Sequence, residues 1–314
     1  MKDYLSFFRK KEKQSKKFLV KHTEYLLPTG IVAIVILLLI AIQFFSWQAK
    51  NDTVFPEPLS SPKVALYPLI ERNFLPQISA QAAFVMDNDS KVVLFAKNEN
   101  FRFSPASTTK IMTALTALDE FNLSDVLTVK EGNIEGSVVG LVKGERMTFE
   151  NLLLAMLLPS GNDAATAIAD NDIGGKEAFV KKMNAKAKFL DLTNTHFGDP
   201  AGLLDDEDYT TAHDLAFLAS YAITHPTLAK IFDTKKTTIT NVEGTIVYPI
   251  ENLNKLLGIY GVDGVKTGYT DEAGEVLVTS TVQQGHTFII VVMKSDDRFG
   301  DTEKLLKLIA DNTT

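Results

Sequence analysis

The feature that most constrains this chain is a run of 25 residues without a charged side chain, from Tyr25 to Ala49. An α-helix rises about 1.5 Å per residue, so about 20 apolar residues cross a hydrocarbon layer roughly 30 Å thick. Residues 26–47 meet that length, and Trp47 lies at one end, where interfacial aromatic side chains are expected. We therefore expect one transmembrane helix over residues 26–47.

The charge beside this run predicts its orientation. Residues 1–25 hold eight basic and three acidic side chains. By the positive-inside rule we expect residues 1–25 to be a basic cytoplasmic tail, which places the remainder outside the cell as part of a single-pass membrane protein. A cleaved signal peptide fits less well, because a cut after Ala49 would put Trp47 where a small residue is needed. An internal core helix fits poorly because the run is too long and apolar.

The composition after this run bounds the remaining function classes. Because residues 1–25 carry a net charge of +5 and the whole chain −7, the remainder carries −12. An acidic body argues against nucleic acid as a partner, since phosphate contacts need clustered Lys and Arg. The chain has no cysteine, which excludes disulfides, a thiol nucleophile and thiolate metal sites.

Proline content and hydrophobic patterning divide the rest into a linker and a domain. Residues 48–76 hold five of the eleven prolines and are expected to form an extended spacer. Residues 77–314 are expected to form one α+β domain, an antiparallel sheet covered by helices. Its expected elements are two hairpins, Ala82–Met86 with Val92–Phe95 and Val276–Thr281 with Thr287–Met293, and helices over Ile111–Phe121, Phe149–Ala169, Asp214–Ile223 and Thr302–Ala310.

The first candidate motif for chemistry is Ser107-Thr108-Thr109-Lys110. Serine is a weak nucleophile and needs a base within hydrogen-bond reach. Residues three apart on a helix share a face, and a desolvated lysine, or one near other cations, loses proton affinity and can act as that base. Alone, the motif is equally typical of a surface helix start after Pro105.

Two further motifs lie downstream. Ser160-Gly161-Asn162 interrupts a strongly apolar helical stretch, where the side chains either cap a helix or supply a proton-relay hydroxyl and a substrate-aligning amide. Lys266-Thr267-Gly268 is expected on an edge strand, where Lys266 offers positive charge to an anionic substrate and Gly268 lets a ligand backbone approach closely. In this order, S-x-x-K, S-x-N and K-T-G form the pattern of penicillin-interacting serine enzymes.

With these motifs, residues 77–314 resemble the D-alanyl-D-alanine carboxypeptidases among the low-molecular-mass penicillin-binding proteins. The resemblance extends to the flanks PASTTKIMTAL, LLLAMLLPSGNDAA and GVDGVKTGYTDEAG, and to Phe197–Ala216 between the second and third motifs. It implies a β-lactamase/transpeptidase-like fold with a helical subdomain. It also implies a peptidoglycan stem peptide ending in D-Ala–D-Ala as substrate, β-lactams as inhibitors, and neither metal nor organic cofactor.

The same resemblance implies roles for individual residues. Ser107 would be the nucleophile and Lys110 its general base, with Ser160 passing a proton to the leaving D-alanine. The backbone amides of Ser107 and Tyr269 would form the oxyanion hole beside Gly268. The residues expected to bind substrate are Asn162, Lys266, Thr267, Gly268, Tyr269 and Arg298, and Arg298 would join Lys266 and Thr267 at the terminal carboxylate.

Three other functions share parts of this pattern. A class A β-lactamase usually has S-D-N as its second motif and an E-x-x-x-N downstream, and the latter does not occur between Asn162 and Lys266. A non-catalytic peptidoglycan-binding module would have lost a catalytic side chain. Endopeptidase action on cross-links would use the same site.

The acidic run 205–208 lacks the pattern of a calcium loop and is expected to be a solvated loop. His196 and His213 lack metal-binding spacing.

Overall fold

The computed structural model of the chain describes residues 38–43, 75–132 and 134–312. By its contacts the chain divides into two units, Met1–Ala65 and Leu66–Thr314. In the first unit the described residues 38–43 are helical, and the rest of the predicted membrane span lies outside the described residues, as do the basic tail and most of the linker. Among the residues that are described, no helix has the length and apolar character to cross a bilayer.

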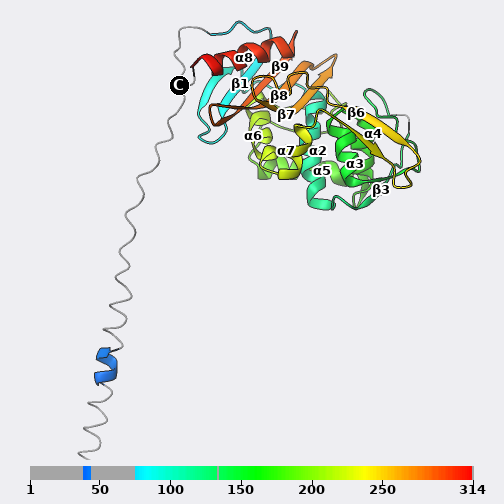
Figure 1. The fold of residues 1–314 in the computed structure, drawn as a ribbon, viewed down its shortest axis with the longest axis horizontal. Coiled ribbons are helices and arrows are strands. Elements are labelled where there is room, and N and C mark those ends of the chain that lie inside the picture. Colours follow the sequence, from blue (N-terminus) through cyan, green and yellow to red (C-terminus); the bar gives the residue numbers. More distant parts are fainter. Residues whose placement is uncertain (1–37, 44–74, 133, 313–314) are drawn as a thin grey trace, which may run out of the picture. The chain divides into compact units, whose positions relative to one another are not determined.

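The second unit is organised around a five-stranded antiparallel sheet with the strand order β2-β1-β9-β8-β7 (Figure 1). The first and last strands in the chain therefore lie side by side, with Ala82 opposite Met293 and Asp87 opposite Phe288. The two expected hairpins are confirmed as β1–β2 and β8–β9. The strands are β1 (Ala82–Asp87), β2 (Val93–Lys97), β7 (Val262–Thr270), β8 (Gly274–Gln283) and β9 (His286–Ser295).

Both faces of this sheet are covered, which explains why every residue of β1 is buried. Side chains alternate between the faces of a strand, so Phe84 and Met86 join one apolar cluster while Ala83 and Val85 join another. The larger cluster packs the sheet against the central helices. The smaller one packs it against Leu305 and Leu306 of α8 (Arg298–Asn312). The expected α+β architecture is confirmed.

The central helices lie between β2 and β7 in the sequence and gather beyond one face of the sheet (Figure 1). Local signals set their starts: the Thr148 and Thr211 side chains accept hydrogen bonds from the backbone N–H three residues on, and Pro226 opens α7. These helices are α2 (Lys110–Glu120), α3 (Phe149–Leu157), α4 (Asn162–Asp170), α5 (Gly175–Phe189), α6 (Ala212–Ile223) and α7 (Pro226–Phe232), preceded by the 3₁₀ helix η1 (Ala106–Thr109).

The helical stretch Phe149–Ala169 is confirmed as two helices, α3 and α4, with the expected interruption at Ser160-Gly161-Asn162. Ser160 has a φ of 67°, a left-handed conformation that no continuing α-helix contains. Two short hairpins flank these helices: β3 (Val126–Thr128) with β4 (Arg146–Thr148), and β5 (Lys236–Thr240) with β6 (Val247–Glu251).

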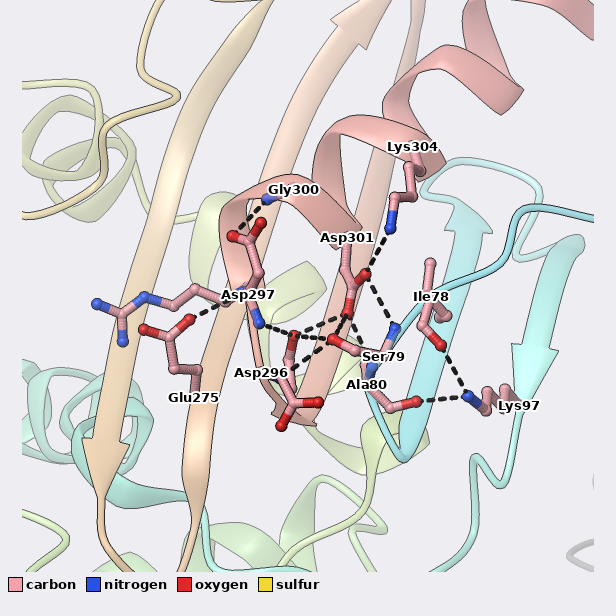
Figure 2. Close-up of polar contacts among 12 residues, drawn as sticks. Ile78, Ser79, Ala80, Lys97, Glu275, Asp296, Asp297, Gly300, Asp301 and Lys304 are labelled. Carbon is pink, nitrogen blue, oxygen red and sulfur yellow. Dashed lines mark hydrogen bonds and ion pairs between the residues drawn. The ribbon is translucent and has the colours of Figure 1, made fainter.

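The carboxylate of Asp301 on α8 connects the segment before β1 to the end of β9 by hydrogen bonds (Figure 2). Asp301 accepts hydrogen bonds from Ser79 N and Oγ and from Ala80 N at 2.7–3.0 Å. Ser295 Oγ at the end of β9 donates to the same carboxylate at 2.8 Å. These contacts outweigh the effect of burial and lower the pKa of Asp301 to about 2. The segment that enters β1 is thereby held against the last strand and helix.

Candidate active site

The first motif places its serine and lysine side by side. Ser107 lies in the 3₁₀ helix η1, and Lys110 begins α2. A 3₁₀ helix has 3.0 residues per turn, so side chains three apart lie directly above one another. Lys110 Nζ is 2.9 Å from Ser107 Oγ. Ser107 is half-buried while its neighbours on both sides are buried, so Ser107 remains reachable from solvent.

Lys110 is fully buried and contacts three oxygen atoms. Besides Ser107, its Nζ donates to Asn162 Oδ1 at 2.8 Å and to the Ala201 carbonyl at 2.7 Å. Burial lowers the pKa of Lys110 to about 7, even though nearby aspartates act in the opposite direction. A neutral amine has two N–H donors and one lone pair, which matches two obligate acceptors and one hydroxyl. The site therefore suits a lysine that takes the serine proton.

The second motif forms the break between α3 and α4. Gly161, not Ser160, is the N-cap of α4, and no side chain caps that helix, so the capping alternative for this motif is wrong. Ser160 Oγ is buried and has no hydrogen-bond partner within the described part of the chain. Asn162 Nδ2 donates to the Glu135 carbonyl at 2.8 Å, which turns its Oδ1 towards Lys110. Asn162 thus orients the base, a role that sequence reasoning missed.

Two aspartates that sequence reasoning missed shape the loops around Lys110. Asp163 accepts hydrogen bonds from the backbone N–H groups of Val139, Gly140, Leu141 and Ala164. Asp199 accepts four more, from residues 201–204. The second set fixes the Ala201 carbonyl that Lys110 contacts. Their signal in the sequence was weak, since nothing in Gly161-Asn162-Asp163 or Asp199-Pro200 shows which backbone groups the carboxylates will meet.

The third motif lies on β7, which is confirmed as an edge strand of the sheet. Lys266 is buried and donates to the Thr267 carbonyl at 3.0 Å. Burial, followed by the charges of Lys110 and Arg298, lowers the pKa of Lys266 well below its usual value. A Cβ at Gly268 would lie 3.3 Å from the Ser107 backbone nitrogen, so β7 runs directly beside Ser107. Thr267 is buried, and Tyr269 is 58% exposed.

Asp205 links the segment before η1 to the end of β7 through hydrogen bonds. This corrects the expectation that residues 205–208 form a solvated loop. Asp205 Oδ1 accepts hydrogen bonds from Ser104 Oγ, just before η1, and from Thr270 Oγ1 at the end of β7. Asp208 is 2% exposed, and burial and then the neighbouring Asp199 raise its pKa to about 8. Asp206 and Glu207 are exposed, as expected.

Arg298 is the first residue of α8 and faces β7 instead of open solvent. Its Nη1 donates to the Gly268 carbonyl at 2.8 Å, and its backbone N–H donates to Glu275 Oε2 at 2.8 Å. The structure thus brings Ser107, Lys110 and Asn162 into one hydrogen-bonded group. Gly268 lies against Ser107, and Arg298 donates a hydrogen bond to the Gly268 carbonyl.

His196 and His213 lie apart from this group, stacked on Tyr209 and packed between Phe84 and Phe217 respectively. No group of three or more His, Asp or Glu side chains among the described residues is placed to hold a metal ion.

This arrangement defines a class of protein. A reachable serine hydroxyl beside a buried amine that can take its proton, set against the edge strand of an antiparallel sheet, is the arrangement of the penicillin-interacting serine acyl-transfer enzymes. Residues 71–297 match the family model Peptidase_S11, D-alanyl-D-alanine carboxypeptidase. The chain belongs to this family of serine peptidases.

Individual relatives agree with this placement. D-alanyl-D-alanine carboxypeptidase DacF of Bacillus subtilis (strain 168) is 38% identical over 222 residues, which cover 68% of this chain and 57% of DacF. D-alanyl-D-alanine carboxypeptidase DacB2 of Mycobacterium tuberculosis is 37% identical over 224 residues, covering 70% of this chain and 76% of DacB2. The solved structure of the Streptomyces K15 DD-transpeptidase superposes with a TM-score of 0.70 at 34% identity, over 75% of this chain and 98% of that one.

Proposed function

We propose that this chain is a serine D-alanyl-D-alanine carboxypeptidase that removes the terminal D-alanine from peptidoglycan stem peptides through an acyl-enzyme on Ser107. The observation that carries this proposal is the 2.9 Å contact between Ser107 Oγ and the buried Lys110 Nζ. Since the pKa of Lys110 is lowered to about 7, a large fraction of the lysine is neutral near pH 7 and able to accept a proton.

Acylation begins when Lys110 takes the proton from Ser107, while Asn162 Oδ1 and the Ala201 carbonyl hold its two N–H groups. The freed Oγ attacks the carbonyl carbon of the penultimate D-alanine. The backbone N–H groups of Ser107 and Tyr269 stabilise the oxyanion, and each such donor contributes about 3–4 kcal/mol to transition-state binding. This places the tetrahedral carbon at the junction of η1 and β7, which pack closely because Gly268 has no side chain.

The tetrahedral intermediate collapses when its C–N bond breaks and the leaving nitrogen receives the proton that Lys110 removed. Ser160 serves as the relay for that proton, because its buried Oγ has no partner among the described residues and lies two residues from Asn162. Asn162 also contacts the substrate amide. Lys266 and Thr267 hold the terminal carboxylate, and an incoming anion favours the charged form of Lys266.

Deacylation uses the same groups with water as the nucleophile. Lys110 takes a proton from the water, the hydroxide attacks the ester carbonyl, and the proton returns to Ser107 Oγ as the C–O bond breaks. A β-lactam would acylate Ser107 in the same way. Because its leaving nitrogen stays tethered after ring opening, the adduct is long-lived and inhibits the enzyme.

We also propose that residues 26–47 anchor the enzyme to the cell membrane, with residues 1–25 in the cytoplasm and residues 77–314 outside. The uncharged run of 25 residues and the net +5 charge before it support this topology. Protease treatment of intact cells should digest residues 77–314 and spare residues 1–25. Digestion of the tail alone would reverse the orientation, and release of the chain into the medium would mean that it is not anchored.

The test of the activity uses the full chain in detergent and a peptide ending in D-Ala–D-Ala, with released D-alanine as the readout. Wild type should release D-alanine and Ser107→Ala should not. Labelled penicillin should form a stable adduct with wild type alone. An adduct without D-alanine release would confirm the nucleophile and reject the peptide as substrate, and the absence of both would contradict the proposal.

A further inference from the structure

The guanidinium of Arg298 donates to one backbone carbonyl and lies over the ring of the next residue, while the backbone of Arg298 is held separately. Its Nη1 donates to the Gly268 carbonyl at 2.8 Å, and its backbone N–H is held by Glu275 Oε2 at 2.8 Å. Its guanidinium carbon is 5.0 Å from the centroid of the Phe299 ring. The side chain is half-buried, so the hydrogen bond to Gly268 forms where water competes weakly.

The carbonyl that Arg298 contacts belongs to the same peptide group as the Tyr269 N–H. In a planar trans peptide the C=O and the N–H point in opposite directions. A cation bound to the oxygen fixes the orientation of the N–H on the far side of the group. It also draws electron density towards the oxygen, which makes the N–H a stronger donor.

In the proposed mechanism the Tyr269 N–H, on the far side of this peptide, faces the reacting carbonyl. Gly268 lies against η1, so close that a Cβ there would be 3.1 Å from the Pro105 carbonyl oxygen and 3.3 Å from Ser107 N. The Ser107 amide is the other donor of the oxyanion hole in the proposed mechanism. A small rotation of the Gly268–Tyr269 peptide would therefore separate the two donors.

We propose that Arg298 is a positioning residue that orients and polarises the Gly268–Tyr269 peptide as an oxyanion donor, an inference that rests on the proposed function. The carboxylate of the substrate is then left to Lys266 and Thr267. This differs from the expectation that Arg298 binds the terminal carboxylate. An arginine is suited to this position because it remains charged when partly buried and presents its N–H groups in a rigid plane.

The two roles for Arg298 predict different kinetics, because the carboxylate leaves with the first product. Acylation involves both the oxyanion and the carboxylate. Deacylation involves the oxyanion alone, since the acyl-enzyme formed from a peptide or thioester no longer carries the terminal carboxylate. An oxyanion role slows both steps, whereas a carboxylate role slows only the first.

The test follows formation and decay of the acyl-enzyme by rapid quench and intact-mass measurement, using the full chain in detergent. The probe is a D-alanyl thioester whose leaving thiol carries a carboxylate, alongside the same thioester with that carboxylate methylated. For Arg298→Gln we expect acylation and deacylation to slow by a similar factor, roughly 10- to 100-fold. We expect the same factor for both thioesters and little change in the half-saturating concentration.

Other outcomes would overturn the inference. Loss confined to acylation by the charged thioester would make Arg298 a carboxylate ligand, and unchanged rates would show that the contact is only structural. Arg298→Lys keeps a cation without the planar fork, so it should retain part of both rates and serves if Arg298→Gln does not fold. Failure of the proposed function itself is distinguished by the wild type, which would then form no acyl-enzyme on Ser107.

Discussion

Gly202 packs against the carbonyl oxygen of Ala106 so closely that no side chain fits between them. This contact seats the loop that follows Asp199 on the 3₁₀ helix that carries Ser107. The residue before Gly202 supplies the carbonyl that holds Lys110 at 2.7 Å. The contact therefore couples the shape of this loop to the position of Lys110, the proposed base.

Gly202→Ala should destabilise the protein and impair acylation. The backbone φ of +79° disfavours any side chain, and the added Cβ would overlap the Ala106 carbonyl. We expect a loss of roughly 2–5 kcal/mol in the free energy of unfolding, from combined strain and overpacking. Gly285→Ala is the matched control, since Gly285 has a φ of +82° with no atom within 4 Å of an added Cβ. It should cost roughly 1–2 kcal/mol and leave penicillin acylation unchanged. Equal losses in the two variants would contradict the packing argument.

The rate of acylation should rise with pH through about 7. Burial lowers the pKa of Lys110 to about that value, and only the neutral amine can accept the Ser107 proton. The measurement is the second-order rate constant for labelled penicillin between pH 5 and 9. Lys110→Arg, which cannot lose its proton in this range, should show no rise with pH and should acylate roughly 10²–10⁴ times more slowly than the wild type above pH 7. A wild-type profile that is flat across this range would exclude Lys110 as the titrating base.

Asp208→Asn should raise stability at alkaline pH. Burial and the adjacent Asp199 raise the pKa of Asp208 to about 8, so the folded protein keeps a proton that the unfolded chain loses near pH 4. Wild-type stability should therefore fall as the pH rises from about 4 to 8. The asparagine mimics the protonated form and removes this slope, with a gain of about 2–4 °C in Tm at pH 8, equivalent to roughly 1 kcal/mol. The exposed Asp206→Asn is the control, and a wild-type slope retained in Asp208→Asn would reject the assignment.

Asp301→Asn should lower stability at neutral pH and remove one source of acid sensitivity. Hydrogen bonds from Ser79, Ala80 and Ser295 lower the pKa of Asp301 to about 2, below the usual 3.8 (Figure 2). A lowered carboxyl pKa stabilises the fold above the unfolded value and loses that effect as the pH falls through about 2. The expected loss at pH 7 is about 2 kcal/mol, measured by urea unfolding. Asp296→Asn, at an exposed neighbour, should change stability by less than about 0.5 kcal/mol, and similar losses in both variants would contradict the network.

Much of the architecture was predictable from local patterns. The two hairpins follow from apolar runs around turn residues, and the positions of α2, α6 and α8 follow from their apolar spacing. The three motifs identified Ser107, Lys110 and Lys266 because nucleophilic and basic side chains leave a direct mark in the sequence. The edge position of the third motif followed from the same reasoning.

The polar residues Ser160-Gly161-Asn162 predicted the break between α3 and α4, but the left-handed backbone at Ser160 could not be predicted from pattern alone. The turn is stabilised by partners outside the stretch, such as the Ser137 carbonyl that accepts from Asn162 N. The acidic run at 205–208 misled for a similar reason. Charge predicts solvation unless the fold supplies partners, and here Ser104 and Thr270 supply them for Asp205.

The sequence by itself determined the family, the candidate nucleophile, the candidate base and the antiparallel α+β class, because these depend on side-chain identity and on short-range periodicity. Only the tertiary structure decided how the amine of Lys110 is positioned. The amine of Lys110 is buried against the Ala201 carbonyl and turned by Asn162, while Asp199 holds the loop and Arg298 meets the Gly268 carbonyl. Backbone carbonyls and amides are the same at every position of a chain. Their roles therefore appear only when folding brings them next to a side chain from a remote part of the sequence.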